Sequence, residues 1–359
     1  MRHKKSVLIT GNMGYIGPVL IRRLRTHHPE MKLIGYDMGY FAQCLTTKRM
    51  FPECLADVQY FGDVRDMTEA HFEGVDAVVH MAAISNDPMG DHFEDVTYEI
   101  NYKASVKVAE MARKMGVGNF VFTSSCSMYG SAEDDARTEQ SPLSPLTAYA
   151  KSKVNTEKAL EKLATDEFTV TSLRFATACG WSERLRLDLV LNDFVAGAMT
   201  SGRITILSDG TPWRPLIDVK DMSRAIDWAI GRNDGNGGSF VAVNVGKNAF
   251  NYQVKTLADA VANILPGVSV SINPDAAPDK RSYRVNFDRF KQLAPDHQPQ
   301  CDLDSSVREI ASGLEAMRFN DSDFRNSNYI RLKVLRQLHE TKLLSKKLTW
   351  VHKNAASEH

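Results

Sequence analysis

A glycine-rich loop directly after a short apolar run is the feature that most constrains this chain. The run Val7–Thr10 has the length of a buried parallel strand, and it leads into the loop Gly11–Gly17 and then a helix-like stretch. In such a loop Gly11 supplies the tight turn, Gly14 lets the backbone approach a pyrophosphate, and Gly17 lets the helix pack closely on the strand. The free N–H groups at the start of the helix attract phosphate. The pattern predicts a dinucleotide-binding strand, loop and helix.

An ordinary loop is the alternative, because the spacing is Gly-x-x-Gly-x-x-Gly rather than the commoner Gly-x-Gly-x-x-Gly. A second strand-like run, Lys32–Tyr36, favours the nucleotide because it ends in Asp37, near the offset of a ribose-binding acid. A carboxylate at this position accepts hydrogen bonds from both ribose hydroxyls and repels a 2′-phosphate. Asp37 therefore favours NAD over NADP, the alternative being an acid in a surface turn.

Size and charge narrow the function classes. The chain has 359 residues, of which 43% are hydrophobic and 25% charged, as in soluble globular proteins. Its formal net charge of zero provides no general attraction to nucleic acid or anionic membrane, and no apolar run is long enough to span a bilayer. The basic residues 2–5 precede too short an apolar run for a signal peptide. We therefore expect a cytoplasmic protein that binds neither nucleic acid nor membrane.

Cysteine and histidine spacing predicts neither disulfides nor a metal site. The five cysteines are odd in number and widely separated, which fits a reducing compartment. The ten histidines show no metal-binding spacing such as His-x-x-x-His.

Apolar runs alternate with helix-like segments through the first half of the chain. This alternation predicts an α/β fold, a Rossmann-type doubly wound parallel sheet joined by right-handed crossovers. The expected strands are Val7–Thr10, Leu33–Tyr36, Val58–Phe61, Ala77–Met81, Phe120–Thr123 and Val170–Arg174, and the expected helices are Gly14–Thr26, Phe93–Met115 and Thr147–Ala164.

The pattern changes after Gly180 to short strands mixed with helices. Strands are expected at Val241–Val245 and Val268–Ile272, and helices at Leu187–Thr200, Val254–Ile264 and Ser305–Met317. We expect a dinucleotide-binding domain over residues 1–180. Residues 181–320 should form a smaller mixed α/β substrate-binding region, with some segments returning to the main sheet. Residues 321–359 should form a basic, helix-prone C-terminal extension whose charges make a solvated face.

Three polar residues in the first half could carry chemistry. Tyr149 and Lys153 are four apart in a predicted helix and so share one face, where an ammonium lowers the pKa of a phenol toward that of a useful base. Ser125 follows the predicted strand Phe120–Thr123, at the carboxyl end where doubly wound sheets bind ligands. There it could donate a hydrogen bond to a substrate oxygen. The alternatives are a chance surface pair and a serine-rich loop that satisfies its own backbone.

These segments together resemble the extended short-chain dehydrogenase/reductase family, and within it the nucleotide-sugar epimerase/dehydratase branch. The match extends to about Lys291. It is carried by the loop Gly11–Gly17, Asp37, Asp63-Val64, His80-Met81-Ala82-Ala83, Ser125, and Tyr149 with Lys153.

The resemblance implies a role for each matching residue. Tyr149 is the expected acid/base, Lys153 its partner and a ribose ligand, and Ser125 the partner of the sugar oxygen. The expected cofactor is NAD, bound by Gly11, Met13, Gly14, Tyr15, Ile16, Gly17, Asp37, Asp63, Val64, Met81, Ala82, Ala83, Tyr149 and Lys153. The expected substrate is a nucleotide-diphosphate sugar, bound by Ser85, Asn86, Asp87, Ser125, Thr177, Asn192, Arg214 and Arg281.

Some of these substrate contacts have alternatives or depart from the family pattern. Ser85, Asn86 and Asp87 could equally cap their own loop. Thr177 stands where the family often has an asparagine that touches substrate, which leaves the sugar open.

One departure bears on the reaction. Where sugar-nucleotide 4,6-dehydratases carry Thr-Asp-Glu, this chain has Ser125-Cys126-Ser127. A thiol and a hydroxyl are poor substitutes for two carboxylates as an acid/base pair at neutral pH, so dehydration is disfavoured. Cys126 has no evident base and is expected to be a packing residue.

The leading hypothesis is an NAD-dependent epimerase that acts on a nucleotide-diphosphate sugar through a transient 4-keto intermediate. A nucleotide-sugar C4 dehydrogenase or 4-ketoreductase is the first alternative. A dinucleotide-sensing scaffold without catalysis is the second, although binding alone does not require Ser125, Tyr149 and Lys153 together. The family resemblance also implies a homodimer.

Overall fold

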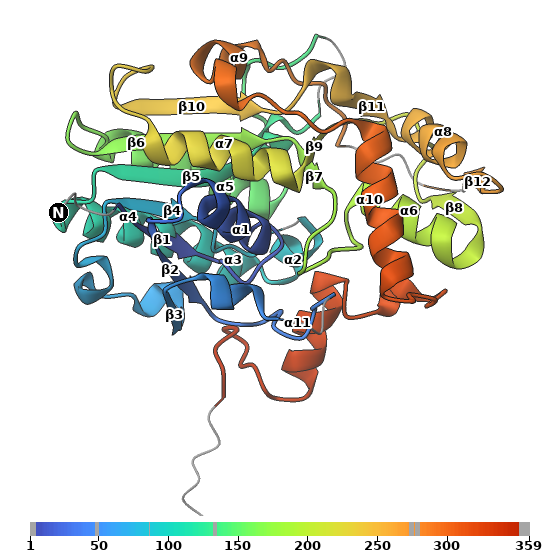
Figure 1. Ribbon diagram of the computed structural model, residues 1–359, viewed down its shortest axis with the longest axis horizontal. Coiled ribbons are helices and arrows are strands. Elements are labelled where there is room, and N and C mark those ends of the chain that lie inside the picture. Colours follow the sequence, from blue (N-terminus) through green and yellow to red (C-terminus); the bar gives the residue numbers. More distant parts are fainter. Residues whose placement is uncertain are drawn as a thin grey trace, which may run out of the picture.

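A computed structural model describes residues 5–46, 50–85, 87–131, 135–272, 276 and 281–351. Its core is a sheet of seven parallel strands in the order β10-β6-β5-β4-β1-β2-β3 (Figure 1). The order reverses between β1 and β4, and ligands of doubly wound sheets bind beyond the carboxyl ends of the strands at such a reversal. The predicted fold class is therefore confirmed. The strands are β1 Ser6–Thr10, β2 Lys32–Asp37, β3 Val58–Phe61, β4 Ala77–His80, β5 Asn119–Ser125, β6 Thr169–Phe175 and β10 Phe240–Val245.

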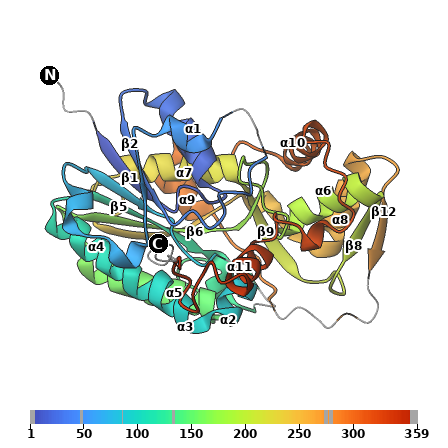
Figure 2. The same ribbon diagram turned by 90° about the horizontal axis from the view of Figure 1, so that it is seen from below.

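Helices cover both faces of this sheet (Figure 2). One side carries α1 (Gly17–His27), α7 (Val219–Gly231) and α9 (Asp288–Leu293), and the other carries α3 (Glu94–Tyr98), α4 (Ser105–Lys114) and α5 (Ala148–Leu163). Alternate residues of β1 point to opposite apolar layers: Val7 and Ile9 pack with Leu20, and Leu8 packs with Val108. All five residues of β1 are buried, which explains its uninterrupted apolar sequence.

The helix predicted over Phe93–Met115 is divided into α3, a π-helical turn at Glu99–Ala104, and α4. Just before it, residues Asp87–His92 form the short helix α2.

A smaller region lies beside the carboxyl ends of the main strands (Figure 1). It has an apolar core of its own, shared by its three helices and a two-stranded parallel sheet. Two of its neighbours in sequence lie with the main sheet: β10 is an edge strand of that sheet, and α7 packs against β4, β5 and β6. The region contains α6 Val190–Ser201, β8 Arg203–Ile206, α8 Val254–Ile264, β12 Ser269–Ile272 and α10 Leu303–Ala316, and a three-stranded sheet of β7 Thr177–Cys179, β9 Trp213–Asp218 and β11 Asn251–Gln253 joins it to the core.

The C-terminal extension folds back onto the main sheet rather than lying apart from it. It contains α11 (Arg331–Glu340) and a following irregular stretch. Leu335, Leu344 and Leu348 are buried in the same apolar layer as Leu8. The predicted solvated face is correct for exposed side chains such as Lys333, but it is wrong for Arg331, which is 1% exposed.

Within the described ranges, no helix combines the length and the apolarity that crossing a membrane requires. The same residues contain no group of three or more His, Cys, Asp or Glu side chains placed to hold a metal ion. All five cysteines are free thiols, and Cys44, Cys126 and Cys179 are buried.

The packing of α1 on β1 depends on the absence of a side chain at Gly17. A Cβ atom there would lie 1.9 Å from the backbone oxygen of Asn12. We predict that Gly17→Ala lowers the free energy of unfolding by about 2 kcal/mol or more, as forced overpacking does. The measurement is urea unfolding at equilibrium. Gly231→Ala is the control, because a Cβ at the end of α7 meets no atom within 4 Å, and its stability should be unchanged or slightly raised. Equal stability of the two variants would contradict this packing argument.

Candidate active site

The site is a cavity of about 810 Å³ at the carboxyl ends of the parallel strands, with the smaller region as its far wall. This volume is in the range of cofactor and substrate pockets. Its walls come from the glycine loop, the ends of β2 and β5, the loop after β4, α5, and residues of the C-terminal extension. Most of the residues predicted for cofactor and substrate therefore meet in one place.

The glycine loop is held tightly between β2 and the loop after β4. Gly11 donates its N–H to the carbonyl of Tyr36 at 2.8 Å and adopts a left-handed φ of 73°. A Cβ on Gly11 would lie 2.6 Å from the backbone nitrogen of Ala82. Gly11, Gly14, Tyr15 and Ile16 line the cavity, and the N-terminus of α1 follows them directly. A loop followed directly by a helix N-terminus at a cavity suits a phosphate group, and phosphate binding at this loop stays a prediction.

Asp37 lies where β2 reaches the cavity. Its two carboxylate oxygens accept hydrogen bonds from the backbone N–H of Gly39 at 2.7 Å and of Met13 at 3.0 Å. Burial raises the pKa of Asp37, and these two hydrogen bonds oppose that effect. The carboxylate is thus fixed beside the glycine loop, within the cavity wall, in the position expected for a ribose ligand.

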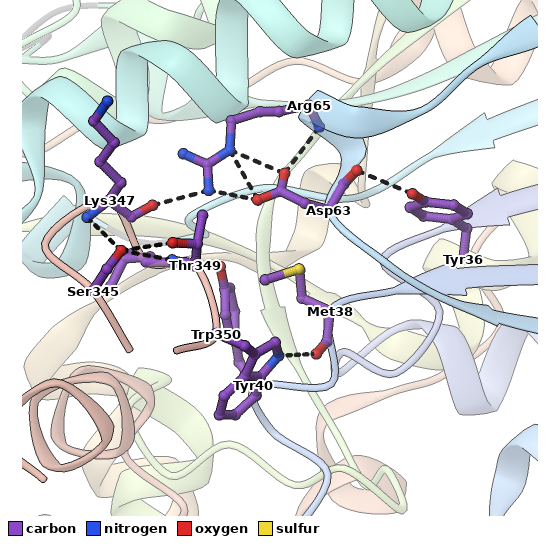
Figure 3. A network of polar contacts seen from close by, with 10 residues as sticks. Tyr36, Met38, Tyr40, Asp63, Arg65, Ser345, Lys347, Thr349 and Trp350 are labelled. Atoms are coloured by element: carbon purple, nitrogen blue, oxygen red, sulfur yellow. Dashed lines mark hydrogen bonds and ion pairs between the residues drawn. The ribbon is translucent and has the colours of Figure 1, made fainter. Parts of the chain in front are cut away.

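A second acid, Asp63, lies at the adjacent end of β3 and also lines the cavity with Val64. Arg65 folds back on it, with its Nε 2.9 Å from Oδ2 of Asp63, and the Tyr36 hydroxyl donates to the Asp63 carbonyl at 3.0 Å (Figure 3). Both the side chain and the backbone of Asp63, a predicted NAD-binding residue, are therefore held by hydrogen bonds.

The loop after β4 supplies the next part of the wall, with Met81, Ala82 and Ala83 lining the cavity. Asn101, in the π-helical turn, accepts from the N–H of Ile84 at 2.8 Å and donates to its carbonyl at 3.0 Å. Its amide also reaches the hydroxyl of Ser152 on α5 at 3.3 Å. Asn101 thereby ties this loop to the helix that carries the candidate catalytic side chains.

Tyr149 and Lys153 lie one turn apart on α5 and both line the cavity. Thr147 caps the helix by accepting from the N–H of Ala150 at 3.2 Å. Lys153 donates to the carbonyl of Thr123 at 2.7 Å, and its Nζ lies 5.6 Å from the centre of the Tyr149 ring. The ammonium is thus anchored to β5 with the phenol beside it.

The electrostatics differ from the sequence-based expectation that Lys153 lowers the pKa of the phenol. In the protein alone, burial and the charge of Asp87 raise the pKa of Tyr149 to about 12, although a hydrogen bond with Ser125 and the charge of Arg186 act in the opposite direction. Burial also lowers the pKa of Lys153 to about 7. The expectation is wrong for the protein alone because burial dominates the pKa of Tyr149, and the opposing effects come from Ser125 and Arg186 rather than from Lys153.

The three residues at the end of β5 divide into two that line the cavity and one that does not. Ser125 and Ser127 line the cavity. The Ser127 hydroxyl is buried and has no hydrogen-bond partner among the described residues. Cys126 is buried, donates to the carbonyl of Arg174 at 3.1 Å, and has its thiol pKa raised by burial. It packs, as predicted, and the segment offers no carboxylate to the cavity.

Most of the predicted substrate residues lie around the same space. Ser85, Asp87, Thr177, Arg214 and Arg281 line the cavity. Arg281 pairs with Asp87 at 2.7 Å, which joins the loop after β4 to the far wall. Asn86 lies outside the described residues.

The structure corrects the prediction for Asn192. This residue is fully buried and is not among the cavity-lining residues. Its amide accepts from the N–H of Gly180 at 3.0 Å and donates to the carbonyl of Arg186 at 2.8 Å. Asn192 therefore shapes the wall from behind. Met13 and Gly17 also support the loop without lining the cavity.

Arg186 and Asp188 are cavity-lining residues that the sequence prediction missed. Their side chains form two hydrogen bonds of 2.9 Å, and Arg186 also reaches the hydroxyl of Ser85 at 3.3 Å. Burial alone raises the pKa of Asp188, but Arg186 outweighs burial and lowers it. Two opposite charges in the otherwise apolar run Leu185–Leu189 were the available signal.

The family of the chain follows from a protein-family model that matches residues 7–246, which is more than half of the chain. The chain belongs to the NAD dependent epimerase/dehydratase family. NAD is the cofactor of this family, and the glycine loop with Asp37 at the end of β2 fits it.

Individual relatives agree with this family but are distant. The chain is 26% identical to a UDP-glucose 4-epimerase of Corynebacterium glutamicum over 313 residues, covering 81% of this chain and 91% of that one. Its fold is similar to a Stenotrophomonas maltophila UDP-glucose-4-epimerase with bound NAD and formylated UDP-arabinopyranose, with a TM-score of 0.75, 20% identity, and coverage of 88% and 99% of the two chains.

The fold is equally similar to a protein that catalyses another reaction. The NAD dependent NDP-hexosamine 5,6-dehydratase TunA matches with a TM-score of 0.73 and 21% identity, over 89% of this chain and 100% of that chain. The fold alone therefore does not select the reaction, and the residues of the cavity must be used instead.

The depressed pKa of Lys153 gives a test of the site's electrostatics. Between pH 7 and about 10 the unfolded chain holds a proton on this lysine that the folded protein has released, so the free energy of unfolding contributed by Lys153 rises with pH. We predict that Lys153→Met removes this rise in urea unfolding measured from pH 7 to 9.5. Lys151→Met, on the exposed face of the same helix, should keep it. Parallel pH profiles for wild type and Lys153→Met would contradict the assignment.

Proposed function

We propose that this protein is an NAD-dependent epimerase of a nucleotide-diphosphate sugar that works through a transient 4-keto intermediate. The observation that carries the proposal is the grouping of Ser125, Tyr149 and Lys153 at the carboxyl end of β5, beside a segment without carboxylates. This set provides for removal and return of a hydroxyl proton. It lacks the acid/base pair that elimination of water requires.

Tyr149 takes the proton from the sugar C4 hydroxyl and later returns it. Its hydrogen bond with Ser125 and the nearby charge of Arg186 stabilise the phenolate, and they partly offset the effect of burial. Lys153, fixed to the carbonyl of Thr123, keeps its amino group beside the phenol, and with a pKa of about 7 this group is charged in only part of the molecules at neutral pH. When bound, NAD supplies the hydride acceptor and donor that this chemistry needs. The protein's own contribution is positioning and proton transfer.

The substrate side supports a diphosphate and a polar sugar. Arg214 and Arg281 place two guanidinium groups at the far wall, and guanidinium groups match phosphate oxygens in pairs. Ser127, whose hydroxyl has no hydrogen-bond partner among the described residues, and Thr177 line the same cavity and offer hydroxyl groups to a polar sugar. UDP is the nucleotide we propose, because the similar epimerases above act on UDP-sugars.

Replacement of the acid/base tests the mechanism. We predict that Tyr149→Phe lowers kcat by about 10²- to 10⁴-fold, the range for loss of a general acid/base, while NAD affinity stays within about twofold of wild type. The measurements are steady-state kinetics and calorimetric titration with NAD. Tyr98→Phe, 42% exposed on α3, is the control and should retain wild-type kinetics. Turnover by Tyr149→Phe close to that of wild type would rule out this role.

Isotope transfer distinguishes epimerisation from the related reactions. With a UDP-hexose deuterated at C4, we predict a C4 epimer that keeps the deuterium, without loss of water and without net NADH. The products can be identified by NMR and mass spectrometry across UDP-, GDP-, CDP- and dTDP-sugars. NADH formed in proportion to product would instead establish a dehydrogenase, and solvent hydrogen at C5 with loss of water would establish a dehydratase.

A further inference from the structure

The C-terminal extension forms part of the cavity wall, a role that neither the family match nor the proposed mechanism accounts for. The family model ends at residue 246, whereas Arg325, Ile330, Arg331 and Leu332 line the same cavity as the glycine loop. The chain therefore returns to its own nucleotide-binding loop after more than 300 residues.

The start of the extension joins two opposite walls of the cavity. The carbonyl of Asn328 accepts from the Cys44 thiol at 3.0 Å, on the loop that follows β2. The carbonyl of Tyr329 accepts from the N–H of Leu187 at 3.0 Å, on the wall that carries Arg186 and Asp188. These contacts hold the segment just before α11 between the two sides.

The end of the extension is fixed to residues that directly follow Asp37 (Figure 3). Trp350 donates its indole N–H to the carbonyl of Met38 at 2.8 Å, and the Tyr40 hydroxyl donates to the carbonyl of Leu348. Arg65, the partner of Asp63, donates to the carbonyl of Lys347 at 2.9 Å. The extension is thus anchored on the cofactor side of the cavity.

Arg331, at the first position of α11, has one buried guanidinium donor without a partner, although its side chain also interacts with the thiol of Cys44. The residue is 1% exposed, its guanidinium carbon lies 4.4 Å from the centre of the Phe41 ring, and Nη2 donates to the carbonyl of Arg184 at 2.7 Å. Nη1 has no hydrogen-bond partner among the described residues, and no described carboxylate forms an ion pair with Arg331. A buried donor of this kind is unfavourable unless a ligand satisfies it.

The surroundings favour an anion as that ligand. The neighbouring cations already have acidic partners: Arg184 pairs with Glu53 at 2.8 Å, and Arg186 pairs with Asp188. Arg331 adds a positive charge to this neutral set, and burial together with the charges of Arg186 and Arg184 lowers its pKa. The N-terminus of α11 adds a partial positive charge at the same place.

We propose that Nη1 of Arg331 binds the pyrophosphate of NAD from the side opposite the glycine loop, and that the extension keeps NAD in the site. The cofactor diphosphate is favoured over the substrate diphosphate because Arg331 contacts Phe41, four residues after Asp37. On the substrate side, Arg214 donates to the carbonyl of Arg281, and the Arg281 side chain pairs with Asp87. The inference rests on the family's cofactor and is independent of the sugar chemistry.

The test compares nucleotides that differ in phosphate content. Full-length protein freed of nucleotide is titrated calorimetrically with NAD, ADP-ribose and adenosine. We expect Arg331→Met to weaken NAD and ADP-ribose about tenfold or more, as for loss of a hydrogen bond between charged groups, with adenosine unchanged. Lys333→Met removes a charge from the exposed face of the same helix and should change none of the three affinities. NAD should also dissociate faster from Arg331→Met in a stopped-flow chase.

Three outcomes would overturn the proposal. Equal weakening of adenosine and ADP-ribose would assign Arg331 to packing on Phe41. Weaker binding of UDP, titrated in the same way as a fourth ligand, with ADP-ribose unchanged would assign it to the substrate. Unchanged affinity for all nucleotides would leave it a structural residue. If Arg331→Met does not fold, Arg331→Lys replaces it, with a smaller loss expected for ADP-ribose because the charge is kept and the guanidinium fork is lost. No sugar is present, so none of these results bears on the proposed epimerase.

Discussion

The rest of the site depends on the close packing of the glycine loop against its neighbours. Because neither Gly11 nor Gly17 carries a Cβ, the loop fits between the backbone after β4 and the start of α1. The helix can then begin directly over the sheet, with its N-terminus at the cavity. Met13 in the same loop fixes Asp37 through its N–H, so one backbone arrangement sets both the helix N-terminus predicted to bind phosphate and the carboxylate predicted to bind ribose.

Buried hydrogen bonds connect the strand before the glycine loop to α5, the helix that carries the candidate catalytic side chains. Thr10, at the end of β1, bonds to His80 at 2.8 Å, and His80 bonds to Ser105 at 2.8 Å. Burial lowers the pKa of His80 to about 3, so the imidazole stays neutral and can donate at one nitrogen while accepting at the other. With Asn101, this chain of polar groups fixes the loop after β4 and α5 in register with the glycine loop.

What could be predicted from the sequence is what depends on local pattern. The strand Val58–Phe61 and the helix Val254–Ile264 match their predicted bounds. In the helix, apolar spacing reflects the face that is buried, whereas Tyr60 and Phe61 of the edge strand are exposed. Site residues on strand ends were found for the same reason. Asn192 was assigned to the substrate from the family resemblance, and a matching position does not tell whether an amide faces a cavity or the wall behind it.

The remaining errors concern contacts between distant segments. The raised pKa of Tyr149 depends on burial by several elements, which no local motif reports. The C-terminal extension looked like a solvated basic helix because Leu335, Leu344 and Leu348 have no visible partners nearby in sequence. Their partners, including Tyr36 and Tyr40, lie about 300 residues earlier.

The packing of the C-terminal extension on the cavity walls affects which redox reaction the site can perform efficiently. An epimerase ends each cycle with the cofactor in its original state, so slow exchange of NAD does not limit turnover. A net dehydrogenase must release NADH and bind NAD in every cycle, and contacts spanning both walls oppose that exchange. Hydrogen bonds at Cys44 and Leu187 tie the segment before α11 to both walls, and the hydrogen bond at Met38 anchors the later stretch on the cofactor side. This packing and the missing carboxylates are independent features, and both favour a reaction that starts and ends with the same bound cofactor.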